Sequence, residues 1–179
     1  MSKREFEDLL KKYEQKPLEK EIDWKKQKQE WLDFIKMFYR SIESWLAPYK
    51  QAGKLSYAYQ KTQLNEEYIG TYDVDVMIVD FAGQKLTLEP IGTLLIGTKG
   101  RIDMEGSRGR VQFILADKNS KGVKINTSIS RDGGAKAEAE EVRTPDWAWK
   151  IVLREPRKIA FVDFTENNFF DAVMEAVNG

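Results

Sequence analysis

Hydrophobic side chains in the first quarter of the chain recur at helical spacing. Ser2 and Glu5 have the spacing of a capping box, and they precede a short apolar stripe. This first stripe comprises Phe6, Leu9, Leu10 and Tyr13. A second and stronger stripe steps by four and three residues through Trp24, Lys28, Trp31, Ile35, Phe38, Ile42 and Trp45. The two stripes predict a short first helix and a long helix over residues 18–47 that Pro48 ends.

The predicted long helix is too long to fit within a compact domain. At 1.5 Å per residue it would extend about 45 Å, which exceeds the width of a domain of this size. We therefore expect its first half to project, so that residues 1–30 form a helical appendage. Two arrangements are open to this appendage: docking on its own domain, or pairing with a second copy in a homodimer through the N-terminal helices.

After Gly53 the hydrophobic pattern changes to alternation with a period of two. The alternating runs are short and are separated by turns that contain glycine; they cover residues 55–63, 71–81, 84–89, 93–96, 101–105, 110–117, 123–129, 147–153 and 158–164. Runs that follow one another so closely predict hairpins, and hence an antiparallel sheet. A last helical stripe covers residues 165–177, whereas residues 131–145 lack apolar periodicity and are interpreted as a mobile loop.

Together these elements predict an α+β fold, because helices flank a run of consecutive strands. The expected architecture is a mainly antiparallel sheet of about seven to nine short strands, with the long N-terminal amphipathic helix and the C-terminal helix packed on it. No linker is long enough to separate two domains, so residues 1–179 are expected to form a single domain.

Two absences from the composition remove much chemistry. The chain of 179 residues has no His and no Cys. This excludes Ser-His and Cys-His nucleophilic sites, disulfides, and zinc, haem or iron–sulfur centres with those ligands. Asp73 and Asp75 share a strand face, but a hairpin turn at Ala82 and Gly83 would put Glu89 on the opposite face, which argues against a metal site. No spacing among the remaining candidates indicates a catalytic set, so the sequence favours a protein without enzymatic activity, metal or cofactor.

The N-terminus carries charged residues and no apolar segment of the kind found in secretory signals. The longest aliphatic runs have about four residues, far fewer than the roughly 20 that span a bilayer. The sequence therefore predicts a cytoplasmic protein that does not enter a membrane.

Charge is balanced over the whole chain but not along it. The 29 Lys and Arg residues equal the 29 Asp and Glu residues in number. Residues 64–96 carry 1 basic and 6 acidic side chains, whereas residues 97–131 carry 8 basic and 3 acidic ones. The candidate partner-binding residues come from this basic segment: Lys99, Arg101, Arg108, Arg110, Lys121 and Lys124. Gly109 leads into a strand rather than a helix, so the glycines of this segment are interpreted as hairpin turns and not as a phosphate-binding loop.

Two functions fit this combination. The first is a non-catalytic protein-binding module, for example an inhibitor or immunity-type protein that blocks a partner, because mixed strand charges, strand edges and a projecting helix are common means of protein contact. The alternative is a nucleic-acid-binding module that uses the basic hairpins of residues 97–131. The zero net charge disfavours nucleic acid, since such proteins usually carry a net positive footprint. We therefore expect the partner to be another protein.

Overall fold

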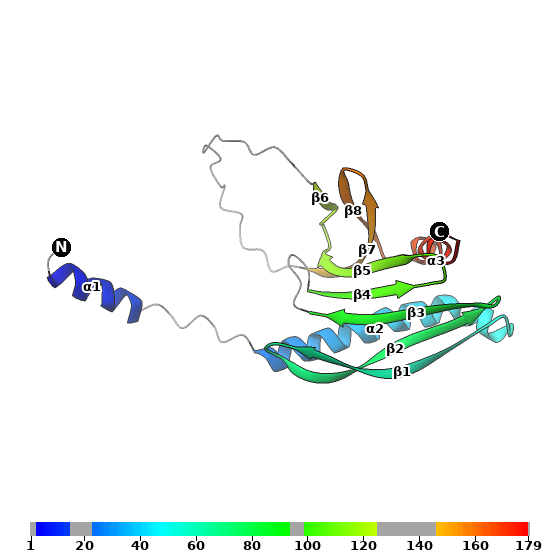
Figure 1. Ribbon diagram of the computed structural model, residues 1–179, viewed down its shortest axis with the longest axis horizontal. Coiled ribbons are helices and arrows are strands. Elements are labelled where there is room, and N and C mark those ends of the chain that lie inside the picture. The colour runs from blue at the N-terminus through cyan, green and yellow to red at the C-terminus, as the bar shows by residue number, and fades with distance from the viewer. Residues whose placement is uncertain (1–2, 15–22, 94–98, 125–145, 179) are drawn as a thin grey trace.

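A long helix and a C-terminal helix pack on an antiparallel sheet in the computed structural model, which describes residues 3–14, 23–93, 99–124 and 146–178 (Figure 1). The helices are α1 (Lys3–Glu14), α2 (Trp24–Gln51) and α3 (Glu166–Asn178). The strands are β1 (Leu55–Glu66), β2 (Gly70–Phe81), β3 (Gln84–Gly92), β4 (Gly100–Glu105), β5 (Arg110–Asp117), β6 (Gly122–Lys124), β7 (Trp147–Glu155) and β8 (Lys158–Asp163). This arrangement confirms the predicted α+β fold.

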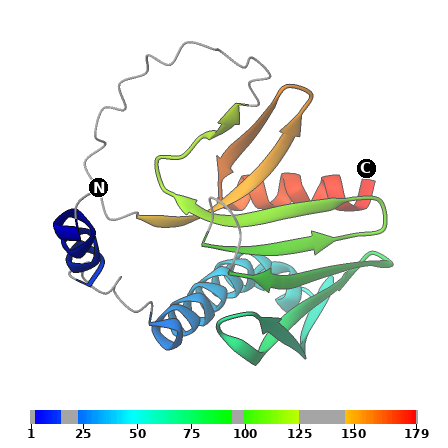
Figure 2. The same cartoon turned by 60° about the vertical axis from the view of Figure 1, so that its left-hand side comes forward.

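The strands of the described residues form one sheet in the order β1-β2-β3-β4-β5-β7-β8-β6, and every neighbouring pair is antiparallel. Strands β1 to β5 follow one another as a meander. The turn at Ala82 and Gly83 places Phe81 opposite Gln84, as the alternation predicts. Figure 2 shows β7, β8 and β6 turning away from the plane of β1 to β5. The sheet is therefore a meander with a second, tilted part at its far edge.

Several predicted strands differ from the structure in extent: β1, β2, β3 and β7 are each longer than the predicted runs. The predicted strand at residues 93–96 does not begin at Thr93, because β3 continues to Gly92 and Thr93 follows it outside any strand. The rest of that run, most of the run at residues 123–129 and the expected loop at residues 131–145 lie outside the described residues.

Helix α2 begins at a capping residue and ends beyond a proline. The Asp23 carboxylate accepts a hydrogen bond from the backbone N–H of Lys26 at 3.1 Å, which satisfies one free donor of the first turn. The expected end at Pro48 is wrong, because α2 continues through Pro48 to Gln51. A proline in the last turn removes a single backbone hydrogen bond, and the packing of the helix offsets that loss. Gly53, with φ of 70°, then reverses the chain.

The first half of α2 does not project, in contrast to the expectation from its length. Trp31 has no exposed surface, and the ring of Trp24 stacks on Tyr68 with the ring centroids 5.0 Å apart. The reason is the length of the β1–β2 hairpin, whose strands have 12 residues each and extend beside the helix. The segment that lies apart is α1, seen at the left of Figure 1.

The core lies between the helices and one face of the sheet. Phe38 of α2 is at its centre, and its ring contacts Phe113 of β5 and Trp149 of β7 at centroid distances of 5.1 and 4.9 Å. The indole N–H of Trp149 donates to the backbone carbonyl of Phe34 at 3.0 Å, so this buried donor is satisfied. Helix α3 closes the core with Phe169, Ala172, Val173, Ala176 and Val177.

Tyr39 occupies a fork in the sheet. Strands β2 and β3 pair only as far as Met77 and Leu88, and beyond that point they separate. The Tyr39 hydroxyl lies 2.6 Å from the carbonyl oxygen of Asp75, to which it donates, and 3.1 Å from that of Leu88. Burial raises the pKa of Tyr39 above its ordinary value, so the hydroxyl keeps the proton that it donates. The Tyr39 side chain thus replaces part of the backbone hydrogen bonding that β2 and β3 lose where they separate.

Candidate functional site

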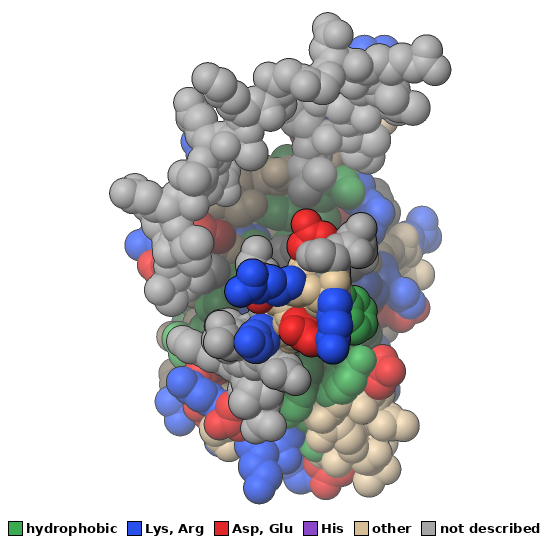
Figure 3. Space-filling model, turned by 90° about the vertical axis from the view of Figure 1, so that its left-hand side faces the viewer, with side chains coloured by type: hydrophobic (Ala, Val, Ile, Leu, Met, Phe, Trp, Pro, Cys, Tyr) green, Lys and Arg blue, Asp and Glu red, His purple; other side chains and the backbone are tan. Residues whose placement is uncertain are grey.

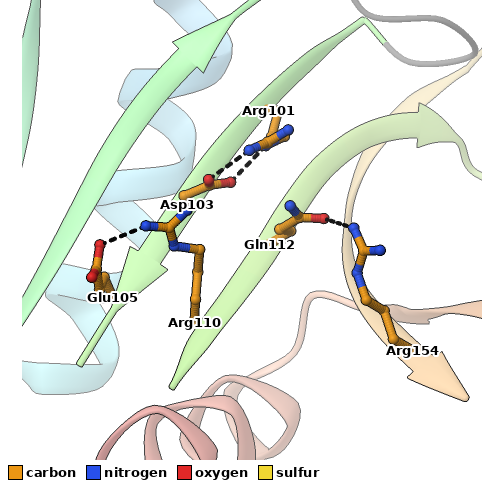
Figure 4. Close-up of polar contacts among 6 residues, drawn as sticks. All are labelled: Arg101, Asp103, Glu105, Arg110, Gln112 and Arg154. Carbon is orange, nitrogen blue, oxygen red and sulfur yellow. Dashed lines mark hydrogen bonds and ion pairs between the residues drawn. The ribbon is translucent and has the colours of Figure 1, made fainter. Parts of the chain in front are cut away.

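The candidate basic residues on β4 and β5 are paired with acids on the outer face of the sheet (Figure 4). Arg101 binds Asp103 through two hydrogen bonds of 2.7 Å each, and Asp103 is buried beneath it. This contact raises the pKa of Arg101. Arg110 lies 3.0 Å from the Glu105 carboxylate on the neighbouring strand. Both arginines are therefore neutralised locally, and a phosphate backbone would have to compete with carboxylates already in place.

The inward and outward positions of β4 follow the sequence prediction. Ile102 and Met104 have no exposed surface and point into the core, while Arg101 and Asp103 lie together on the opposite face. Alternation of side chains along a strand determines this arrangement. Beside it on the outer face, Arg154 of β7 donates to the amide oxygen of Gln112 at 2.9 Å. A row of polar contacts therefore crosses β4, β5 and β7.

Lys99 and Arg108 lie at opposite ends of β4. The Lys99 ammonium forms a 2.6 Å ion pair with Glu30 of α2 and lies above the rings of Phe34 and Trp147. Arg108 is exposed in the β4–β5 turn, where its backbone N–H donates to the carbonyl of Ala176 at 3.0 Å. Six residues of strand separate the two side chains by about 20 Å.

Lys121 and Lys124 lie near the far edge of the sheet. Lys121 is exposed just before β6, and the backbone of Lys124 pairs with Lys158 of β8, while the side chain of Lys124 lies outside the described residues. The candidate residues therefore do not form one basic surface. They are distributed over both ends of β4, the outer face of the sheet and its edge.

The end of the molecule at which α2 begins carries charges of both signs (Figure 3). A hollow of about 330 Å³ at this end is lined by Gln27, Thr93, Lys99 and Trp147. Behind it, the Glu66 carboxylate accepts hydrogen bonds from the backbone N–H and the hydroxyl of Thr93, at 2.6 and 2.9 Å, and from the hydroxyl of Tyr72. These contacts join the β1–β2 hairpin to the end of β3 and have a structural role.

Asp73 and Asp75 do not form part of a metal-binding cluster. Asp75 forms a 2.9 Å ion pair with Lys61 on the neighbouring strand, and this contact raises the pKa of Lys61. Across the residues that the structure describes, no group of three acidic side chains converges as a metal site requires.

Sequence reasoning missed a buried lysine on the outer side of the sheet. The Lys150 ammonium donates to the Lys118 carbonyl at 2.9 Å and to the exposed Asp163 carboxylate of β8 at 2.5 Å. The hydrogen bond to this ammonium lowers the pKa of Asp163. The sequence did contain one sign of this buried lysine, because Lys150 lies between apolar residues of the run at 147–153. Its hydrogen-bond partners could not be identified from that run, since they come from other segments.

The sequence analysis also did not anticipate an apolar groove beside the C-terminal helix. It encloses about 280 Å³ at the C-terminal end of α2, and it is lined by Leu46, Tyr49, Lys54, Leu55, Val79, Phe81, Ala82, Leu86, Phe169, Phe170, Val173 and Met174. These residues belong to α2, β1, β2, β3, α3 and the turns between them. No local pattern could have identified the groove, because its walls are distant in sequence.

A second unpartnered apolar surface lies on α1. The residues from Lys3 to Lys11 are all exposed, and Phe6, Leu9 and Leu10 each keep about half of their surface accessible to solvent. The three side chains share one helix face because they are three and four residues apart. Helix α1 is thus amphipathic and does not bury its apolar stripe.

Comparison of the chain with protein-family models, curated proteins and solved structures found no match. None of the described helices combines the length and the apolar character needed to cross a membrane. Function must therefore be argued from the surfaces themselves.

Proposed function

We propose that this protein is a non-catalytic protein-binding module and that α1 is its principal contact element. The observation that carries the proposal is the half-exposed apolar stripe of Phe6, Leu9 and Leu10. A short amphipathic helix with its stripe exposed has the form of helices that bind in the hydrophobic grooves of other proteins, anchored by residues three and four apart. Burial of such a stripe supplies the free energy of association.

The polar face of α1 favours a protein over a membrane as its partner. Helices that lie on membranes carry mainly Lys and Arg on their polar face, since those residues meet anionic headgroups. Among the described side chains of α1, Lys3, Arg4 and Lys11 are balanced by Glu5, Glu7 and Asp8. A face of mixed charge fits a partner protein of complementary pattern, where charged pairs contribute specificity.

The ion pairs of the outer sheet face favour a protein over a nucleic acid. Arg101 and Arg110 would each have to leave a carboxylate before binding a phosphate. Affinity for nucleic acid depends on the number of phosphates neutralised, and paired arginines contribute little to that number. A module of this kind acts by occupying its partner, and for that reason we place the inhibitor or immunity-type role within the same proposal.

Affinity capture with the full chain tests this function. Nuclease-treated and untreated lysates of the source cell are compared, using the parent, a Leu9→Glu/Leu10→Glu variant and a Met37→Glu control. Met37 is an exposed side chain of α2, so the control adds a negative charge to a different helix. The proposal expects one stoichiometric protein, recovered after nuclease treatment, which the α1 variant loses and the control retains.

Two results would contradict the proposal. Recovery of nucleic acid alone, abolished by Arg108→Glu with Arg110→Glu, would favour the basic hairpins of residues 97–131. Capture of the same protein by the parent and the α1 variant would show that α1 is not the contact element. Circular dichroism of each variant confirms that the fold is retained.

A further inference from the structure

The groove between α2 and α3 has the composition of a site for an apolar ligand. Its lining contains aliphatic and aromatic side chains from six segments and a single charged residue, Lys54. Tyr49 and Met174 stand at the groove with about half of their surface exposed, although each lies on a helix that packs on the core. Exposed apolar side chains around a concave apolar surface are typical of binding sites.

The turn that borders the groove holds an unfavourable backbone conformation. Ala82 has φ of 49°, a left-handed conformation that glycine or asparagine adopts more readily, and Gly83 follows with φ of 73°. Among the described residues, Ala82 is the only one other than glycine with positive φ. Its methyl group forms part of the groove wall. Strained residues of this kind concentrate at functional sites, where the surrounding structure maintains them.

Lys54 supplies a positive charge without a partner at the groove. The side chain is exposed, and it forms no hydrogen bond or ion pair with the residues that the structure describes. Its backbone N–H is held by the Tyr49 carbonyl at 3.0 Å, so the residue is fixed where α2 leads into β1. An apolar wall with one free cation is complementary to a molecule with an apolar body and one anionic end.

We infer that the groove binds a single-chain aliphatic carboxylate of medium length, with the chain against the apolar wall and the carboxylate beside the Lys54 ammonium. At roughly 30 Å³ for each water-sized group, a volume of about 280 Å³ holds about nine such groups. A chain of eight to ten carbons is the expected optimum. This inference goes beyond the proposed protein-binding function and is independent of α1.

Titration calorimetry of the full chain with hexanoate, octanoate and decanoate tests the site. The expected result is saturable binding of one molecule per chain, with affinity rising by up to about fourfold for each added methylene until the groove is filled. Octanol should bind more weakly than octanoate, because it lacks the charge that Lys54 attracts. Absence of saturable octanoate and decanoate binding at millimolar concentration would overturn the inference, as would affinity that does not depend on chain length.

Two variants, each with a control, locate the ligand. Met174→Glu adds a negative charge beside the groove and should abolish octanoate binding, whereas Met37→Glu should leave it unchanged; the two methionines are 53% and 58% exposed, so neither change disturbs the core. Lys54→Gln should weaken octanoate by about two- to fivefold and leave octanol unaffected. Lys85→Gln, which removes an exposed lysine that does not line the groove, is the matched control.

Ala82→Gly separates a binding role from a structural one. Glycine relieves the unfavourable φ, so the melting temperature should not fall. It also removes one methyl group from the groove wall, so octanoate should bind up to about fourfold more weakly. Octanoate binding that survives Met174→Glu unchanged would overturn the assignment of the ligand to this groove, and so would an affinity unaltered by Lys54→Gln.

Discussion

Replacing Phe38 with alanine tests whether the stripe of α2 holds the fold together. Phe38 has no exposed surface, and its ring contacts Phe113, Trp149 and Phe164 with centroid distances of 5.1, 4.9 and 4.8 Å. Truncation removes the burial of the ring and leaves a cavity that neighbouring rings cannot fill. The expected loss is about 3–5 kcal/mol of the free energy of unfolding, a large part of the roughly 5–15 kcal/mol that stabilises a typical domain.

Urea denaturation followed by tryptophan fluorescence measures this loss, because Trp149 reports on the same part of the core. Met37→Ala is the matched control, since it truncates the neighbouring and exposed side chain of the same helix and should change stability by less than about 0.5 kcal/mol. Phe38→Leu should lie between the two, because leucine fills part of the cavity. A denaturation midpoint of Phe38→Ala equal to that of Met37→Ala would refute the placement of α2 on the sheet.

Three further outcomes follow from single contacts. Tyr39→Phe removes the hydroxyl at the fork between β2 and β3, and urea denaturation should show a loss of about 1–3 kcal/mol in the free energy of unfolding. Because burial raises the pKa of Tyr39 in the folded protein, the unfolded state ionises first as the pH rises. The stability of the parent should therefore fall above about pH 10, and that of Tyr39→Phe should fall less. Gly106→Ala would bring a Cβ within 2.3 Å of the Ala176 carbonyl oxygen of α3. Thermal unfolding should then show a loss of about 1–3 kcal/mol in the free energy of unfolding. An unchanged melting temperature would contradict that close approach. Asp163→Asn leaves the buried Lys150 ammonium without its counter-charge and should lower the melting temperature more than Glu155→Gln, which breaks an exposed pair with Lys158.

The parts of the fold that the sequence predicts best are those with local causes. The period of α2 and the alternation of β4 are properties of neighbouring residues, so the burial of Phe38 and Ile102 followed directly. The extent of α2 was predicted less well, because tertiary packing decides whether a helix passes a proline such as Pro48. The stripe likewise could not show which elements cover Trp31, because it indicates a hydrophobic helix face and not the strands that pack against it, here β4 at Gly100 and β7 at Trp149.

The candidate site shows the same limit more strongly. The basic segment was visible as a local excess of charge, but whether each charge is free depends on partners in other strands or at other positions. Glu105 pairs with Arg110 from the adjacent strand, and Glu30 of α2 pairs with Lys99, which is 69 residues away in the sequence. The apolar groove has no local signature at all, because Tyr49, Ala82 and Met174 meet only after the chain has folded.

The two surfaces that the fold leaves unpartnered are far enough apart to be tested separately. Helix α1 precedes the N-terminal end of α2, whereas the groove lies at its C-terminal end. Helix α2 has 28 residues, which corresponds to about 42 Å at 1.5 Å per residue. Substitutions at such a distance usually act additively. Leu9→Glu with Leu10→Glu should therefore leave carboxylate binding intact, and Met174→Glu should leave the captured protein complex intact. If either variant abolished both activities, the two surfaces would belong to one site, and the assignment of separate ligands would have to be abandoned.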